Sequence, residues 1–174
     1  MLRRRGGGGD GTSSAYKMRE KMLSIGDDFW IETGAGQRAF FVDGKALRVR
    51  ETLEIKDPQG TVLLKLKAKL VTIRDVMTIE RGDETVATVK KALISPLRDR
   101  FTVEFKDGSE WKVQGNIVNH EYEIDGPGGP IARVSKAWFR IRDTYGVDVA
   151  PNNDDAMVLA VAIVVDQMSH DVGR

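Results

Sequence analysis

Basic side chains at alternating positions of one segment form the first group whose spacing suggests a binding function. Lys65, Lys67 and Lys69 are two residues apart, so in a strand they share one face about 7 Å from each other. Such ammonium groups attract phosphates of an anionic membrane, at about 1 kcal/mol per residue near the surface. We therefore take six residues as candidates for binding an anionic lipid head group: Lys65, Lys67, Lys69, Arg74, Lys90 and Lys91. The alternative is a solvated strand face whose lysines discourage edge pairing.

A second basic group is interleaved with aromatic residues. It surrounds Trp138 and Phe139 and consists of Arg133, Lys136, Arg140 and Arg142. This combination is typical of lipid interfaces and of nucleic-acid-binding surfaces. The spacing does not place all four cations on one strand face, so we rank this group below the lysines.

Acidic residues gather before the last apolar segment and offer hard oxygen ligands of the kind that calcium takes. The candidates are Asp148, Asp154 and Asp155. The pattern lacks the central glycine and final glutamate of an EF-hand. Capping of a helix that begins here explains Asp154 and Asp155 without a metal, so we predict no metal site.

Catalytic patterns are weaker still. Ser169, His170 and Asp171 carry the letters of a triad, but consecutive helical positions point about 100° apart and cannot form a nucleophile–base chain. The two histidines, His120 and His170, fit no metal-ligand spacing, and His120 is expected at a turn or strand start. The glycine-rich segments lack the lysine of a phosphate-binding loop. We predict a protein that is not an enzyme and needs no cofactor.

The elements that carry these residues are mainly strands. Apolar and polar residues alternate with period two, interrupted by turn residues, which predicts a mainly β fold. About twelve strands are expected, at residues 16–23, 28–32, 38–42, 47–56, 61–71, 75–80, 84–93, 100–105, 110–117, 120–124, 131–139 and 143–149.

The exception is a run of ten apolar residues, Ala156 to Val165, that predicts a C-terminal helix at about residues 154–169. A helix that is apolar on every face must be buried, and ten residues are too few for a bilayer, which needs about 20. Many strands must close to hide their edges, and so wide a barrel needs a filler. We therefore predict an antiparallel barrel that encloses this helix, with Asp154, Asp155 and Asp166 where the helix meets water.

Composition limits the remaining classes. The 174 residues contain 27 Lys and Arg against 26 Asp and Glu, so no global field points to nucleic acid. There is no cysteine, and the Arg-rich and Gly-rich start lacks the apolar region of a secretory signal. We expect a disordered tail at residues 1–15 and one domain at residues 16–174, in a soluble, monomeric and cytoplasmic protein that reaches membranes only peripherally.

The order of these features resembles the LURP-one-related proteins, which with phospholipid scramblases belong to the tubby C-terminal-like superfamily. The resemblance rests on Glu54 to Gly60, on Tyr145 to Val149, and on Asp154 to Asp166. It implies a tubby-like, twelve-stranded antiparallel barrel around a buried helix. Tubby domains bind phosphoinositides and scramblases carry an acidic calcium-binding segment before their last helix, but many members have no assigned biochemistry. None of the lipid-contacting residues of tubby aligns with a particular residue here.

We therefore expect a binding module for anionic phospholipid head groups or a membrane surface. A protein-interaction scaffold that uses a sheet edge or a loop rim is the alternative. A small-molecule-binding or hydrolytic enzyme is the third reading, and the sequence shows no convergent polar site for it.

Overall fold

The computed structural model describes residues 12–19, 28–44, 52–68, 76–92, 99–139 and 141–170. Within these ranges the chain forms twelve strands and helix α2, Asp155–His170. The strands are β1 Ser14–Arg19, β2 Phe29–Thr33, β3 Arg38–Asp43, β4 Thr52–Lys56, β5 Val62–Ala68, β6 Val76–Arg81, β7 Glu84–Lys91, β8 Asp99–Phe105, β9 Glu110–Asn116, β10 Glu121–Gly126, β11 Gly129–Ser135 and β12 Thr144–Val149.

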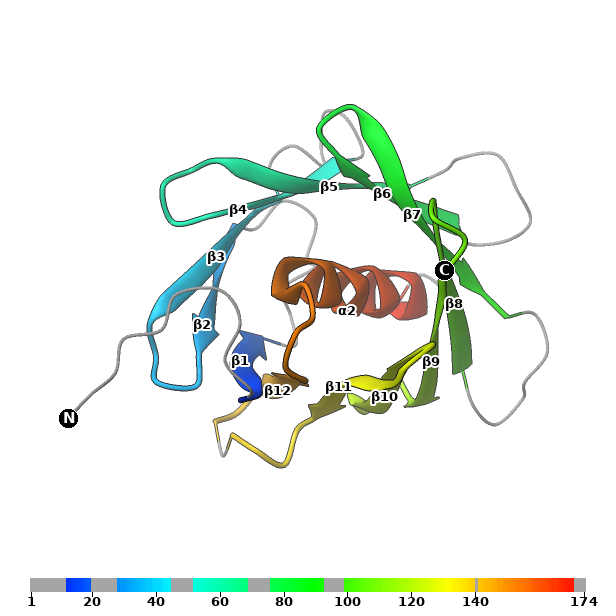
Figure 1. Cartoon of the computed structure of the whole chain (residues 1–174). Coiled ribbons are helices and arrows are strands. Elements are labelled where there is room, and N and C mark those ends of the chain that lie inside the picture. Colours follow the sequence, from blue (N-terminus) through cyan, green and yellow to red (C-terminus); the bar gives the residue numbers. More distant parts are fainter. Residues whose placement is uncertain are drawn as a thin grey trace.

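The strands form one closed antiparallel barrel, as predicted (Figure 1). Each strand pairs with its neighbours in the sequence, and β1 closes the ring by pairing with β12, where Tyr16 stands opposite Val147. Closure leaves no strand edge unpaired, which removes the template for edge-to-edge association.

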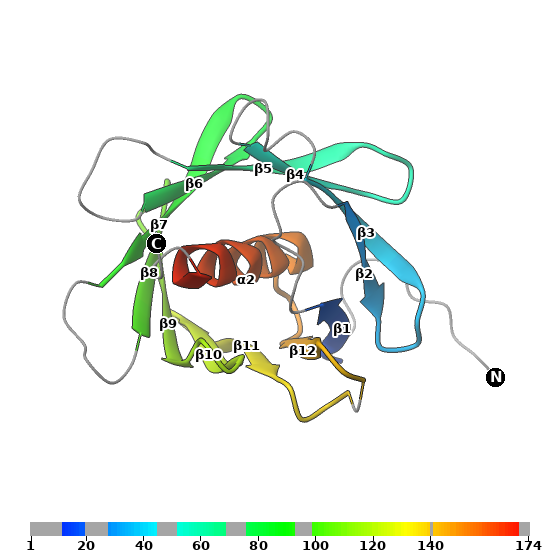
Figure 2. The ribbon, with the colours of Figure 1, turned by 180° about the vertical axis from the view of Figure 1, so that it is seen from behind.

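Helix α2 lies inside the ring of strands, which both views show (Figures 1 and 2). Met157 through Asp166 are all buried, and Val158 to Ala162 have no exposed surface. The strands contribute alternate residues to the same core, such as Ile55, Leu66 and Val103. The apolar run therefore fills the barrel, as predicted. Among the described residues, no helix is both long enough and apolar enough to cross a membrane.

The two rims of the barrel are built differently, and we name them after the helix. The N-rim, where α2 begins, carries tight hairpin turns. In two of them, Gly60 (φ +89°) and Gly108 (φ +87°) adopt the left-handed conformation that glycine tolerates best. The aspartates Asp57 and Asp107 stabilise these turns by accepting hydrogen bonds from backbone N–H groups two residues on. The C-rim, where α2 ends, carries the β9–β10 turn and the β11–β12 connection.

The observed strands correspond one to one with the predicted ones, with shifted ends. β1 begins at Ser14, inside the predicted tail, because backbone pairing with Val149 of β12 requires no apolar side chain. Parts of five predicted strands lie outside the described residues: 20–23, 47–51, 69–71, 75 and 93. Most of the predicted tail, residues 1–11, lies outside them too.

Candidate functional site

Helix α2 is fixed in the barrel by tyrosine–aspartate hydrogen bonds at both ends. The Tyr16 hydroxyl on β1 donates to Asp155 in the first turn, and the Tyr145 hydroxyl on β12 donates to Asp166 near the last. Burial and the bond to Asp155 raise the pKa of Tyr16 well above its usual range. Since β1 and β12 are neighbours, one seam of the barrel sets the position of the helix along its axis.

Asp154 caps the helix at the N-rim. Its carboxylate accepts a hydrogen bond from the Met157 backbone N–H at 3.1 Å, which satisfies one of the donors that a helix start leaves open. Its second oxygen lies 2.5 Å from a terminal guanidinium nitrogen of Arg81 at the end of β6. The cap therefore also ties the helix to the β6–β7 hairpin.

A buried polar cluster lies inside the C-rim, around Asp166. Nδ1 of His120 is 3.3 Å from a carboxylate oxygen of Asp166, and the His120 ring stacks on Tyr145 with centroids 4.2 Å apart. His120 reaches inward because it adopts the left-handed region (φ +52°) at the close of the β9–β10 turn. The prediction that Asp166 meets water is wrong: Asp166 is 5% exposed, since Tyr145 and His120 accompany it into the core.

Tyr122 is the fourth member of this cluster. Its side chain is 3% exposed, and its hydroxyl has no hydrogen-bond partner among the described residues. Burial, and then the negative charge of Asp166, raise the pKa of Tyr122 well above its usual range. The cluster joins Asp166 of the helix to Tyr145 and His120 of the barrel, so we assign it to holding the helix.

Three cations of the predicted set, Lys65, Lys67 and Lys90, lie on the outer face of β5 and β7, and carboxylates are interleaved with them. Nζ of Lys67 lies 2.9 Å from a carboxylate oxygen of Glu80. Nζ of Lys90 lies 2.7 Å from Glu104. Exposed pairs of this kind contribute little stability, but each places an anion beside a cation that was predicted to attract phosphate.

The remaining members of that candidate set differ from one another. In register, Lys65 stands between Glu54 on β4 and Glu80 on β6. Lys91 lies over the ring of Phe101, at 5.8 Å from its centroid. Lys69 and Arg74 lie outside the described residues. Across β4 to β8 the described face is therefore mixed in charge rather than basic, and its role in lipid binding stays a prediction.

The three calcium candidates have separate environments. Asp154 caps the helix and pairs with Arg81, and Asp155 accepts the hydrogen bond from Tyr16. Asp148 lies on β12, opposite Arg133 in register. In the described part of the chain, no three acidic or histidine side chains converge on a point that suits a metal ion.

Sequence reasoning missed an apolar group at the C-rim. The exposed fractions are 65% for Val118, 41% for Trp138 and 55% for Ile141. Val118 lies in the β9–β10 turn, and the other two lie in the β11–β12 connection. The two segments are linked through Glu121, whose carboxylate accepts hydrogen bonds from the Ser135 hydroxyl and the Lys136 N–H, each at 2.9 Å. We call Val118, Trp138 and Ile141 the apolar rim.

Trp138 packs directly on the backbone of β12 at Gly146. A Cβ atom at Gly146 of β12 would come within 2.6 Å of Trp138 and 2.9 Å of Phe139, so these rings lie directly on the outer side of the strand. Only glycine permits this approach. The signal for this group in the sequence is a valine in a turn between two asparagines, Asn116 and Asn119, and an isoleucine between two arginines.

Cations surround the apolar rim. The guanidinium of Arg133 lies 6.0 Å from the centre of the Trp138 ring. Arg142 has 95% of its side chain exposed, and its guanidinium lies 3.9 Å from the carboxylate of Asp143. Lys136 follows the end of β11, and Arg140 lies outside the described residues. Of the second basic group, the structure places Arg133 over Trp138, while Lys136 and Arg142 lie in the connection that carries Trp138 and Ile141.

Comparison with known proteins agrees with this architecture. Residues 14–166 match the family model described as LURP-one-related. The uncharacterised protein YxjI from Bacillus subtilis strain 168 is 27% identical over 154 residues, which are 88% of this chain and 93% of YxjI. An X-ray structure of a protein from Arabidopsis thaliana superposes with a TM-score of 0.68 at 16% identity, over 94% of this chain and 93% of that one. At that identity the structural likeness shows the fold alone.

Proposed function

This chain belongs to the LURP-one-related family, and we propose that it is a non-enzymatic module that binds anionic phospholipid membranes through the C-rim. One observation carries the proposal. Of the four large apolar side chains exposed in the described part of the chain, three lie in two connections of the C-rim, and the guanidinium of Arg133 lies over one of them, Trp138. Exposed apolar groups that are gathered together mark interaction surfaces, whereas scattered ones do not.

The interior supports a binding module rather than an enzyme. Helix α2 fills the space in which a barrel of this width would otherwise hold a substrate. Three of the ionisable groups within it, His120, Tyr145 and Asp166, contact one another. The matching family model and fold indicate no catalytic class. Binding is therefore expected on the outside.

A membrane suits the composition of the rim better than a purely polar ligand does. Tryptophan prefers the interfacial region, where its ring is buried and its N–H remains hydrated, and Ile141 adds aliphatic surface. Arg133, Lys136 and Arg142 each contribute about 1 kcal/mol near an anionic surface, or about 100-fold in partitioning together. In this proposal the protein is a cytoplasmic monomer that reaches the membrane peripherally.

Flotation with liposomes tests the proposal. The full chain is mixed with phosphatidylcholine vesicles that contain or lack phosphatidylserine, at low salt and at physiological salt. We expect binding that needs the anionic lipid, weakens with salt, and falls at least tenfold in Trp138→Ala/Ile141→Ser. Failure of the wild-type chain to float with anionic vesicles contradicts the proposal.

A second variant separates the two basic surfaces. Lys65→Glu/Lys67→Glu/Lys90→Glu reverses three charges on the lysine face and leaves the C-rim intact. We expect it to float almost like the wild type. If this variant loses binding while the Trp138→Ala/Ile141→Ser variant retains it, the lysine face is the membrane site and the C-rim is not. The chain is a protein-interaction scaffold if the wild type binds neither kind of vesicle but binds a purified partner protein, and if Trp138→Ala/Ile141→Ser no longer binds that protein.

A further inference from the structure

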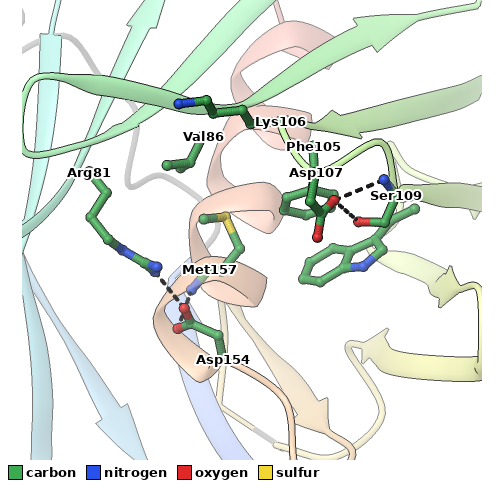
Figure 3. Close-up of a pocket in the computed structure, with 9 residues that line it drawn as sticks. Arg81, Val86, Phe105, Lys106, Asp107, Ser109, Asp154 and Met157 are labelled. Atoms are coloured by element: carbon green, nitrogen blue, oxygen red, sulfur yellow. Dashed lines mark hydrogen bonds and ion pairs between the residues drawn. The ribbon is translucent and has the colours of Figure 1, made fainter.

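A pocket opens at the N-rim, at the opposite end of the barrel from the proposed membrane surface. It has a volume of about 340 Å³ and lies between the β6–β7 hairpin, the β8–β9 hairpin and the first turn of α2. Figure 3 shows Met157 of the helix between Arg81 and Val86 on one side and Phe105 on the other. Mouths of barrels are common ligand sites, and this volume is at the lower end of their usual range.

The walls of the pocket are apolar. Val86, Phe105, Trp111 and Met157 line it, and the rings of Phe105 and Trp111 pack at 4.6 Å between centroids with a 60° tilt. A Cβ at Gly126 would come within 3.3 Å of the Trp111 ring, so that glycine gives the ring its position. A tilted aromatic pair facing a flexible thioether accommodates a flat or short apolar group.

The two carboxylates at the edge of the pocket, Asp107 and Asp154, accept hydrogen bonds from neighbouring groups. The Asp107 carboxylate accepts hydrogen bonds from the Ser109 N–H at 2.8 Å and from its hydroxyl at 2.6 Å, which lower the pKa of Asp107. The Asp154 carboxylate accepts from the Met157 N–H and from Arg81. Both bonds to Asp107 use the same oxygen, Oδ1, whereas each oxygen of Asp154 has its own partner.

Two cationic side chains at the edge of the pocket, Arg81 and Lys106, can donate further hydrogen bonds. A guanidinium carries five N–H groups in a fork, and the Arg81 contact with Asp154 uses one terminal nitrogen. Asp154 in this way holds the guanidinium at the edge of the pocket, as Figure 3 shows. Lys106 pairs with Glu84 in a contact where both side chains are more than half exposed, and such pairs exchange partners at little cost.

We propose that this pocket binds a small amphipathic anion, with its apolar group between Phe105, Trp111 and Met157 and its carboxylate on Arg81. The proposal follows from the apolar walls of the pocket and from the N–H groups of Arg81 that its contact with Asp154 does not use. It is independent of membrane binding at the C-rim, and it assigns the chain a second, small-molecule ligand.

Isothermal titration calorimetry with three probes of one shape tests the proposal on the full chain. The probes are 1-naphthoate, the neutral 1-naphthalenemethanol and the cationic 1-naphthylmethylammonium. We expect naphthoate to bind tightest and the cation weakest. Arg81→Gln should lower naphthoate affinity by about 10- to 100-fold, the effect of one charge-assisted hydrogen bond, and leave the alcohol unchanged.

Two further variants control for folding and for non-specific binding. Lys56→Gln removes a comparable ion pair, with Asp43 at 2.7 Å, from a strand that does not line the pocket, and should leave naphthoate binding unchanged. Val86→Phe fills the pocket without removing a charge, and should abolish binding of all the probes while its thermal melting stays cooperative. Equal binding of the anion and the cation, or unchanged binding in both Arg81→Gln and Val86→Phe, overturns the proposal. Liposome flotation of Val86→Phe should match that of the wild type, so this variant tests the pocket separately from membrane binding at the C-rim.

Discussion

Two tyrosines in the buried cluster at the C-rim allow a matched test of how the helix is held. Tyr145 and Tyr122 are both buried near Asp166, and removing the hydroxyl from either leaves the same ring in the same core. The Tyr145 hydroxyl donates to Asp166, whereas the Tyr122 hydroxyl has no partner among the described residues. Tyr145→Phe and Tyr122→Phe should therefore have different effects on the free energy of unfolding.

The magnitudes follow from the two environments. Tyr145→Phe removes a hydrogen bond to a charged group that is 5% exposed, which costs about 1.5–3 kcal/mol. For a chain of this length that corresponds to a fall of about 3–12 °C in Tm. Tyr122→Phe removes a buried hydroxyl that gains nothing from its surroundings, so we expect no loss, or a gain of up to about 1 kcal/mol.

Urea unfolding of the three proteins, monitored by circular dichroism, measures these differences at constant m-value. The account of the helix anchor fails if Tyr145→Phe is as stable as the wild type. It also fails if Tyr122→Phe loses as much as Tyr145→Phe, because volume and burial rather than the bond to Asp166 would then set the stability. A changed m-value would identify an altered denatured state and call for the same comparison by thermal melting.

Three other properties are expected. Asp154→Ala should cost about 1 kcal/mol in urea unfolding, because it removes the helix cap, and Asp154→Asn, which keeps a capping oxygen, should restore most of that loss. Tyr16 and Tyr122 have raised pKa values in the folded state, so the folded chain keeps protons that the unfolded chain loses above about pH 10. The contribution of these two tyrosines to stability should therefore be complete below that pH and should fall as the pH rises beyond it. Tyrosinate absorbance should appear together with unfolding. Tyrosinate absorbance that develops near pH 10 in a chain that stays folded would contradict this. Gly146→Ala should displace Trp138, since the new Cβ would come within 2.6 Å of its ring, and weaken liposome flotation while the circular dichroism spectrum keeps its strand signal.

Alternation along single segments predicts the strands, and their number together with the apolar helix predicts the barrel. Around Lys65 and Leu66 successive side chains point to opposite sides of the sheet, and the structure buries Leu66 completely. The apolar run from Met157 to Val165 predicted its own burial, because no face of that helix tolerates water. These properties depend on local period and composition, which a sequence displays directly.

The surface and the buried cluster depend on contacts between distant segments. Asp166 follows an apolar run and so resembles the end of a buried helix, but Tyr145 and His120 reach it from strands and turns far away in the sequence. Likewise, Lys67 looks like an unpaired cation until the register places Glu80 beside it. Exposure of Trp138 depends on the Gly146 surface beneath it. None of these contacts leaves a periodic signal.

Depth-dependent quenching by brominated lipids tests membrane binding by the C-rim most directly. The variant Trp30→Phe/Trp111→Phe leaves Trp138 as the single tryptophan, and it is bound to phosphatidylserine vesicles whose chains carry bromine at shallow or deep positions. We predict strong quenching by shallow bromine, weaker quenching by deep bromine, and none with vesicles that lack the anionic lipid. Fluorescence of Trp138 that is unquenched on vesicles carrying the bound protein would show that the apolar rim does not meet the membrane, and would contradict the proposed function.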